Sequence, residues 1–201
     1  MRSPSIVVFD LGKVLVDFDY SIAARKIAAQ SRKSLAEIKV LIEQSRFVID
    51  YETGRMTRRE FYERVREATG FRGTLEEFGE FFADIFTEIP PMIELHAEVR
   101  RRGIPTYIFS NTNDLAIEHV RRSFPFYANF DGYIYSYEVG AMKPDGKIYE
   151  ALEKLAGRRG ADVVYLDDRP ENVEGGAARG WQAILHETPE KTRAAVKKCL
   201  S

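Results

Sequence analysis

Short apolar runs rich in β-branched and aromatic residues recur along the chain, separated by longer segments in which apolar residues recur with helical spacing. Five of these runs have the length of buried strands, at residues 6–9, 106–110, 132–136, 163–166 and 183–185. Most of them are apolar at consecutive positions, so both faces of each strand are expected to be covered. This is typical of a parallel sheet.

The segments between the strands carry start and stop signals of helices. Residues 91–103 begin with a proline and end with Gly103, and residues 145–157 begin with an aspartate and end with Gly157. A last segment, at 189–200, predicts a helix that covers the sheet. Strands that alternate with helices predict an α/β fold, with a Rossmann-like three-layer core built on a parallel sheet.

One region departs from this alternation, because no strand is evident between about residue 20 and residue 87. Three sequences there have the spacing of a capping box, in which a hydroxyl and a carboxylate satisfy backbone N–H groups at a helix start. They are Ser34 with Glu37, Thr57 with Glu60, and Thr74 with Glu77. We therefore predict an all-helical cap at residues 17–87, inserted into a core domain formed by residues 1–16 and 88–201.

Composition and charge narrow the classes of partner. The chain has 201 residues, 44% of them hydrophobic, which is enough to bury a core. Its 30 lysines and arginines nearly balance 31 aspartates and glutamates, so no net field favours nucleic acid or an anionic membrane. The single cysteine, Cys199, excludes an internal disulfide and a cysteine-based metal cage. No segment has the roughly 20 apolar residues of a membrane span or resembles a secretion signal, so we expect a cytoplasmic protein.

Polar side chains follow the predicted strands where each strand ends. In chain order they are Asp10, then Ser110 and Asn111, then Lys143 in a loop, then Asp167 and Asp168. Each alone has an ordinary explanation as a turn former, a helix cap or a solvated lysine. In parallel sheets, however, ligands bind at the carboxyl ends of the strands, so these side chains are expected to converge at one edge.

Their combination indicates a particular chemistry. Three carboxylates brought together would repel each other unless a hard divalent cation such as Mg²⁺ were bound among them. A serine hydroxyl, backbone amides and a lysine at the same edge would bind an anion. A carboxylate, a divalent cation and an anion site together favour phosphoryl transfer, in which an aspartate attacks phosphorus and forms an aspartyl phosphate.

Four motifs in order resemble those of the haloacid dehalogenase-like (HAD) hydrolases. They are DLGKV from residue 10, IFSN from residue 108, KP at residues 143–144 and YLDDRPENVEGG from residue 165. The resemblance covers nearly the whole chain, and the predicted cap lies where one subgroup of the family carries its cap, between the first two motifs. Longer stretches such as ETGRMTRREF and KPDGKIYE resemble the bacterial branch that includes alpha-D-glucose 1-phosphate phosphatase.

The resemblance implies a role for each residue at the strand ends. It implies Asp10 as the nucleophile and Lys143 as a second catalytic residue. The residues that would hold the phosphoryl group are Ser110, Asn111 and Lys143. The residues that would bind Mg²⁺ are Asp10, Gly12 through its carbonyl oxygen, Asp167 directly or through water, and Asp168. The implied substrate is a small phosphorylated metabolite, with a sugar phosphate as one option.

Gly12 departs from the commoner pattern of the family. That position usually holds a second aspartate, which protonates the leaving group and later activates water. General acid–base catalysis typically contributes about 10² to 10⁴ in rate, so its loss would be large without abolishing turnover. Lys13, Asp17 and Asp19 are nearby polar residues that could substitute.

Three functions therefore stay open. The first is a phosphatase for substrates whose leaving group needs little protonation, such as anomeric sugar phosphates or acyl phosphates. The second is a metal-independent 2-haloacid dehalogenase, which also lacks the second acid, although unneutralised Asp167 and Asp168 would repel an anionic haloacid. The third is a ligand-binding or regulatory protein that kept the fold and lost the activity.

Specificity is expected to lie in the cap, which would exclude water and shape the leaving-group pocket. Phe47 and Tyr51 are candidates, although cap aromatics more often belong to the core of the cap itself. Glu52 and Gly54 fall at a predicted turn between two cap helices. There Gly54 would stop a helix, and contact with substrate is the alternative.

Overall fold

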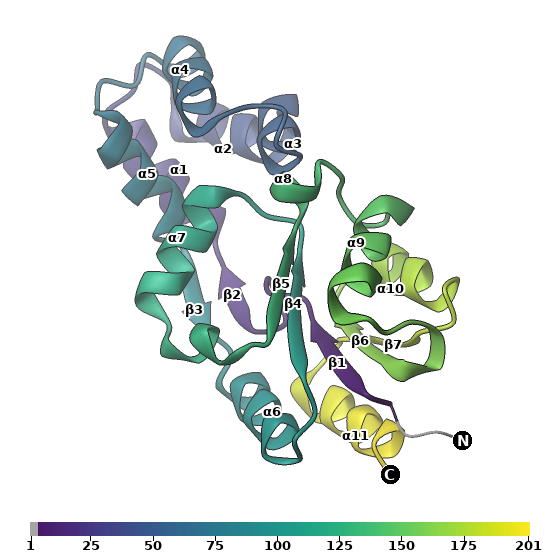
Figure 1. The fold of residues 1–201 in the computed structure, drawn as a ribbon. Helices are drawn as coiled ribbons and strands as arrows, with labels where there is room; N and C mark the ends of the chain where they lie inside the picture. The colour runs from purple at the N-terminus through teal and green to yellow at the C-terminus, as the bar shows by residue number, and fades with distance from the viewer. Residues whose placement is uncertain (1–3) are drawn as a thin grey trace.

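The computed structural model describes residues 4–201, except for the side chains of Glu43 and Gln44. Its centre is a five-stranded parallel sheet of order β5-β4-β1-β6-β7 (Figure 1). The strands are β1 (Ile6–Phe9), β4 (Thr106–Ser110), β5 (Gly132–Tyr135), β6 (Val163–Asp167) and β7 (Gln182–Leu185). Two have the predicted bounds, and the other three differ by one residue at one end. The predicted parallel sheet is confirmed.

Helices cover both faces of this sheet. They are α6 (Pro90–Arg101), α7 (Asp114–Ser123), α8 (Ser136–Val139), α9 (Gly146–Ala156), α10 (Pro170–Ala177) and α11 (Pro189–Cys199), with 3₁₀ turns at Pro125–Asn129 and Gly160–Asp162. Successive strand residues point to opposite faces, so Val7 and Phe9 pack with residues of α6, α7 and α11, whereas Ile6 and Val8 pack with residues of α9. This is the predicted Rossmann-like three-layer fold. Among the helices of residues 4–201, none has the length and apolarity required to cross a membrane.

Local signals position the loops at the carboxyl edge of the sheet. Asp145 begins α9 by accepting a hydrogen bond from the Lys147 N–H, and Gly157 ends it with φ +62°. Helix α7 is capped by Asn113, whose side chain accepts from the Ala116 N–H at 3.0 Å. Ser110 therefore has no part in capping α7, which was the ordinary explanation of its position.

Five helices between β1 and α6 form a helical insert above the carboxyl ends of the strands (Figure 1). They are α1 (Tyr20–Ala29), α2 (Leu35–Gln44), α3 (Arg46–Glu52), α4 (Arg58–Thr69) and α5 (Leu75–Ala83). All three predicted capping boxes are present, at the starts of α2, α4 and α5. Stacked and edge-on aromatic rings, among them Phe61, Phe78 and Phe82, give the insert a hydrophobic core of its own.

A two-stranded antiparallel ribbon joins the insert to the sheet domain. The expectation of no strand between about residues 20 and 87 was wrong only at the end of that range, where a strand begins at Phe86. The ribbon pairs β2 (Val16–Phe18) with β3 (Phe86–Glu88). Each strand has three residues and is partly exposed, which is too short for an alternating pattern to identify. The predicted boundaries of the cap, at 16/17 and 87/88, fall inside these two strands.

Candidate active site

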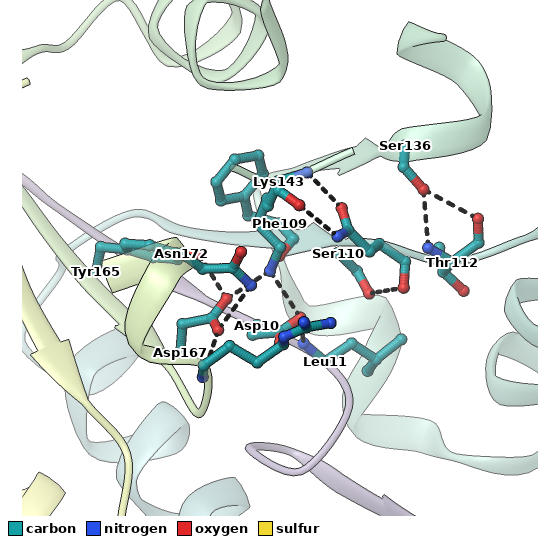
Figure 2. A network of polar contacts seen from close by, with 12 residues as sticks. Asp10, Leu11, Phe109, Ser110, Thr112, Ser136, Lys143, Tyr165, Asp167 and Asn172 are labelled. Carbon is teal, nitrogen blue, oxygen red and sulfur yellow. Dashed lines mark hydrogen bonds and ion pairs between the residues drawn. The ribbon is translucent and has the colours of Figure 1, made fainter. Parts of the chain in front are cut away.

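Lys143 lies between two buried carboxylates at the carboxyl edge of the sheet (Figure 2). Its Nζ is 2.6 Å from Oδ2 of Asp167, at the end of β6, and 3.1 Å from Oδ1 of Asp10, directly after β1. It also donates to the carbonyl oxygen of Phe109 in β4, at 2.7 Å. Three neighbouring strands thus supply the acceptors that fix one ammonium group.

Asp167 is the anchor of this network, because four donors surround its carboxylate. Oδ2 accepts from Lys143 and from the Tyr165 hydroxyl at 2.5 Å, while Oδ1 accepts from the Arg169 N–H at 2.9 Å and from Asn172 Nδ2 at 3.0 Å. Burial raises the pKa of Asp167, but Lys143 and the other donors outweigh it and hold that pKa below its ordinary value. Tyr165 was not predicted, although a tyrosine within an aliphatic strand two residues before an aspartate is a usable signal.

Asp10 is less well compensated than Asp167. Its Oδ1 accepts from the Leu11 N–H at 2.7 Å and contacts Lys143, whereas none of the described donors reaches Oδ2. Burial raises the pKa of Asp10 to about 8, an effect that Lys143 opposes and Asp167 reinforces. A nucleophilic carboxylate at this position therefore needs a further positive charge beside it at neutral pH.

The structure brings together a set of oxygen ligands that suits such a charge. Asp10, Asp167 and Asp168 each offer a carboxylate oxygen, and these atoms all lie within 4.8 Å of one another. Asp168 is half-buried, and burial followed by the charge of Asp167 raises its pKa. Hard oxygen ligands at this spacing fit a divalent cation such as Mg²⁺, which would offset both effects.

The end of β4 supplies the groups for an anion. Ser110 is buried, and its hydroxyl makes only a long 3.4 Å contact to the Asn111 carbonyl oxygen, so it is available to a ligand. The Asn111 side chain instead binds the backbone of Lys143, accepting from its N–H at 2.7 Å and donating to its carbonyl oxygen at 3.0 Å. Through these two bonds Asn111 fixes the loop that carries Lys143, so only its backbone N–H is left for a phosphate.

The space that a side chain at Gly12 would need is already filled. A Cβ on Gly12 would lie 2.9 Å from Cε1 of Phe18, whose ring packs edge-on against Tyr20 and Phe86. The Lys13 ammonium lies 4.6 Å from the centre of the same ring. A second acid at this position would therefore require the Phe18 ring to move.

Of the three nearby polar residues that could replace that acid, Lys13 lines the cavity that contains Asp10, whereas Asp17 and Asp19 do not. Asp17 forms an ion pair with Lys13, and both side chains are largely exposed. Asp19 caps α1 through the Ser21 N–H at 2.8 Å. Neither aspartate is among the residues around the cavity that contains Asp10.

A cavity of about 650 Å³ separates this edge of the sheet from the helical insert. We call its lower side the floor, which includes Asp10, Gly12, Ser110, Asn111, Lys143 and Asp168. We call the residues that the insert contributes the roof, namely Tyr20, Ile42, Ser45, Val48, Ile49 and Glu52. The roof is mostly apolar, and Glu52, the last residue of α3, is the only carboxylate among these six residues.

Comparison with known proteins agrees with this geometry. The sequence model of the family described as haloacid dehalogenase-like hydrolase matches residues 4–180. D-Ribitol-5-phosphate phosphatase of Bacteroides thetaiotaomicron is 24% identical over 190 residues, which cover 90% of this chain and 91% of that protein. A sesquiterpene phosphatase of Aspergillus oryzae is 24% identical over 180 residues, covering 88% and 87%.

The fold also matches a solved structure. A HAD-family enzyme of Bacteroides thetaiotaomicron, in complex with magnesium and inorganic phosphate, superposes with a TM-score of 0.81. The two chains are 21% identical, and the match covers 90% of this chain and 93% of the other. At this identity the likeness shows a shared fold.

Proposed function

Because the chain belongs to the haloacid dehalogenase-like hydrolase family, we propose that it is a Mg²⁺-dependent phosphatase that hydrolyses a small phosphomonoester through an aspartyl phosphate on Asp10. The observation that carries the proposal is the convergence of Asp10, Asp168 and Lys143 at one edge of the sheet. Relatives named as phosphatases support it. A sugar phosphate is one candidate substrate, in line with the polyol phosphate in the name of one relative.

Each floor residue has a task in this reaction. Oδ2 of Asp10, which accepts no hydrogen bond from the donors that the structure describes, attacks phosphorus. The Ser110 hydroxyl and the Lys143 ammonium bind the phosphoryl oxygens and stabilise the charge that develops on them. Asp10, Asp168 and the Gly12 carbonyl oxygen would hold Mg²⁺, with Asp167 bound through water. The cation would neutralise the acids and the phosphoryl group.

We further propose that the helical insert is a cap, with residues 17–87 as the cap domain and residues 1–16 and 88–201 as the core domain. The insert has its own hydrophobic core, which Leu115 of α7 also joins, and it meets the sheet domain through polar contacts as well. Arg58 on α4 donates to Asp114 at 2.8 Å and to Glu118 at 2.6 Å, and the Tyr51 hydroxyl also bonds to Asp114. A cap held in this way would exclude water from the reacting groups.

Phosphate release from a panel of phosphomonoesters tests the proposal. The panel contains sugar, polyol, prenyl and nitrophenyl phosphates and an acyl phosphate, each with Mg²⁺ or with a chelator. Metal-dependent release that Asp10→Asn lowers by about 10⁴-fold, while Asp162→Asn leaves it intact, is the expected result. Asp162 is a matched control because it precedes β6, at the opposite edge of the sheet from Asp167. Absence of release would overturn the proposal, and halide release from 2-haloacids would then indicate a dehalogenase.

A further inference from the structure

The direction of the reaction fixes where a proton donor must lie. In displacement at phosphorus the nucleophile and the leaving oxygen are roughly in line, on opposite sides of the phosphorus atom. Asp10 attacks from the floor, so the leaving oxygen faces the roof. The water that later attacks the aspartyl phosphate approaches from the same side. Gly12 has no side chain that could serve these steps from the floor, so we expect the group on the helical insert or the upper wall of the cavity.

Few side chains of the cavity meet this requirement. Among the side chains that the structure describes, its carboxylates are Asp10, Asp168 and Glu52, and the first two belong to the floor. The other side chains there that carry a titratable proton are Lys13, Tyr20, Lys143 and Arg169. The three cations are held in ion pairs with carboxylates, and burial raises the pKa of Tyr20 further above its ordinary value. Glu52 is left as the group that can both give and take a proton on the roof.

Contacts on both sides of Glu52 hold it over the floor. The preceding residue, Tyr51, bonds to Asp114 at the start of α7. Two residues further on, Gly54 adopts φ +67° and approaches α8 so closely that a Cβ would lie 2.1 Å from the Tyr137 carbonyl oxygen. Figure 1 shows α3 next to α8 above the sheet, and these two helices are in contact. Glu52 itself forms no hydrogen bond or ion pair with any of the side chains that the structure describes, so among them its carboxyl is free for a ligand.

We propose that Glu52 is the general acid and base of the phosphatase reaction and replaces the acid missing at Gly12, an inference that rests on the proposed function. As Asp10 bonds to phosphorus, the bond to the leaving oxygen breaks and its electron pair stays on that oxygen. The Glu52 proton passes to it, which yields the free alcohol. The resulting carboxylate then takes a proton from water as the water oxygen attacks phosphorus. The Asp10–phosphorus bond breaks, phosphate leaves, and Glu52 is protonated again.

The surroundings of Glu52 suit this exchange. Burial raises the pKa of Glu52 to about 7, and the charge of Arg169 opposes the effect only in part. At neutral pH both protonation states are populated, which is the condition for efficient general acid–base catalysis. A phosphatase that relies on Glu52 also has no need of substrates with exceptionally good leaving groups.

Glu52→Gln, compared across leaving groups, tests the proposal. The variant keeps the shape of the side chain and loses the proton. For the best substrate of the panel with an alcohol leaving group, kcat/KM is expected to fall about 10² to 10⁴-fold. For nitrophenyl phosphate, whose leaving group needs no proton, kcat/KM falls less than about 10-fold. Hydrolysis of the aspartyl phosphate is slowed for every substrate, so nitrophenol appears as a burst of one equivalent per enzyme and the phosphoenzyme accumulates.

Further readouts separate catalysis from structure. The wild-type kcat/KM for the alcohol ester is expected to fall as pH rises above about 7, and Glu52→Gln lacks this limb. Glu52→Asp restores part of the rate. Glu67→Gln, an equal charge change on an exposed site of α4, leaves all parameters unchanged. An equal loss for both leaving groups without a burst, or no loss, overturns the proposal for Glu52. Wild-type protein that releases no phosphate from the panel overturns the proposed function instead.

Discussion

At the floor of the cavity, the buried carboxylates of Asp10 and Asp167 share the Lys143 ammonium. On the roof, by contrast, Glu52 lies among apolar side chains and has no partner among the described residues. The floor charges are held by strands of the sheet, whose positions the hydrophobic core fixes. The roof charge is held by a short helix on a separate unit. A compensated network keeps one protonation state, and an uncompensated group can change its state. The difference assigns electrostatic stabilisation to the floor and proton transfer to the roof.

Lys143→Met should have the largest effect, because it removes the charge that compensates the two buried carboxylates at the floor. Removing the ammonium leaves Asp10 and Asp167 buried without a counter-charge, which typically costs about 3–5 kcal/mol of unfolding free energy, and phosphatase activity should be lost. Lys147→Met, at an exposed position of the following helix, is the control. The measurement is urea unfolding in chelator at neutral and acidic pH.

The pH dependence of that variant has a definite sign. In the folded wild type the pKa of Asp167 lies below its ordinary value of 3.8, so its pairing contributes stability above that pH and loses it as pH falls. The variant lacks this contribution, and the two stability curves should therefore converge in acid. A gap that is as wide at acidic pH as at neutral pH would show that packing, and not charge compensation, is the role of Lys143.

Gly54→Ala should disturb the position of the roof. An alanine must adopt φ +67° there, and its Cβ would meet the Tyr137 carbonyl oxygen, so we expect a loss of roughly 2–4 kcal/mol together with a raised KM. Gly103→Ala has nearly the same strain, with φ +73°, but nothing lies within 4 Å of its Cβ. It should lose only about 1–2 kcal/mol and keep its KM. Equal losses in the two variants would mean that the contact between Gly54 and α8 does not hold the roof in position.

Glu52→Gln should be more stable than the wild type at high pH, which is the sharpest contrast with the floor. The folded pKa of Glu52 is raised from its ordinary 4.5 to about 7, so the folded state of the wild type loses stability as pH rises from about 4.5 to about 7 and the loss stays constant above that. The gain at pH 8 should be about 1–2 kcal/mol, reduced from the full linkage because the cavity is open to solvent, and it should vanish below pH 4.5. Thermal unfolding at both pH values checks it. A gain that persists at low pH would point to packing.

The sequence predicted the floor better than the roof, for a physical reason. Asp10, Ser110, Asp167 and Asp168 lie at the ends of strands, which converge in a parallel sheet whatever the loops do, so their order along the chain was enough. Lys143 lies in the loop after α8, which the Asn111 side chain fixes at the same edge. Glu52 depends on how α3 packs on α7 and α8, contacts that involve residues about 60 to 85 positions away. No local pattern reports such contacts.

The same distinction explains what was missed within the fold. Capping boxes and apolar runs act through near neighbours in the chain, and the helix starts and sheet strands they predicted are present. The β2–β3 ribbon pairs residues about 70 positions apart with only three residues a strand, so it leaves little local pattern. The filling of the space at Gly12 by Phe18 likewise follows from that ribbon.

An aspartate at position 12 should replace the proposed role of Glu52 only if the Phe18 ring no longer occupies the space for its side chain. In the Glu52→Gln background, Gly12→Asp alone should restore no activity, because its Cβ would lie 2.9 Å from the Phe18 ring. Adding Phe18→Ala opens that space, and the alcohol ester should regain about 10-fold in kcat/KM, or about 1.4 kcal/mol of barrier. Phe18→Ala without the aspartate is the control. Recovery in that control would mean that Phe18 obstructs the site and that the added acid does nothing.

Arg58→Met should have the smallest effect, because it breaks polar contacts between insert and sheet domain that are partly exposed. The bonds to Asp114 and Glu118 leave the Arg58 side chain 34% accessible, so solvent screens them and we expect a loss of about 0.2–1 kcal/mol. Added salt should shrink the difference from the wild type, which unfolding at low and high ionic strength would measure. Arg59→Met, one residue along and exposed, should change neither quantity. If the Arg58 variant instead lost several kcal/mol at every salt concentration, Arg58 would hold the helical insert rigidly against the sheet domain. The exchange of protons between Glu52 and ligands that enter and leave would then need an explanation other than movement of the insert.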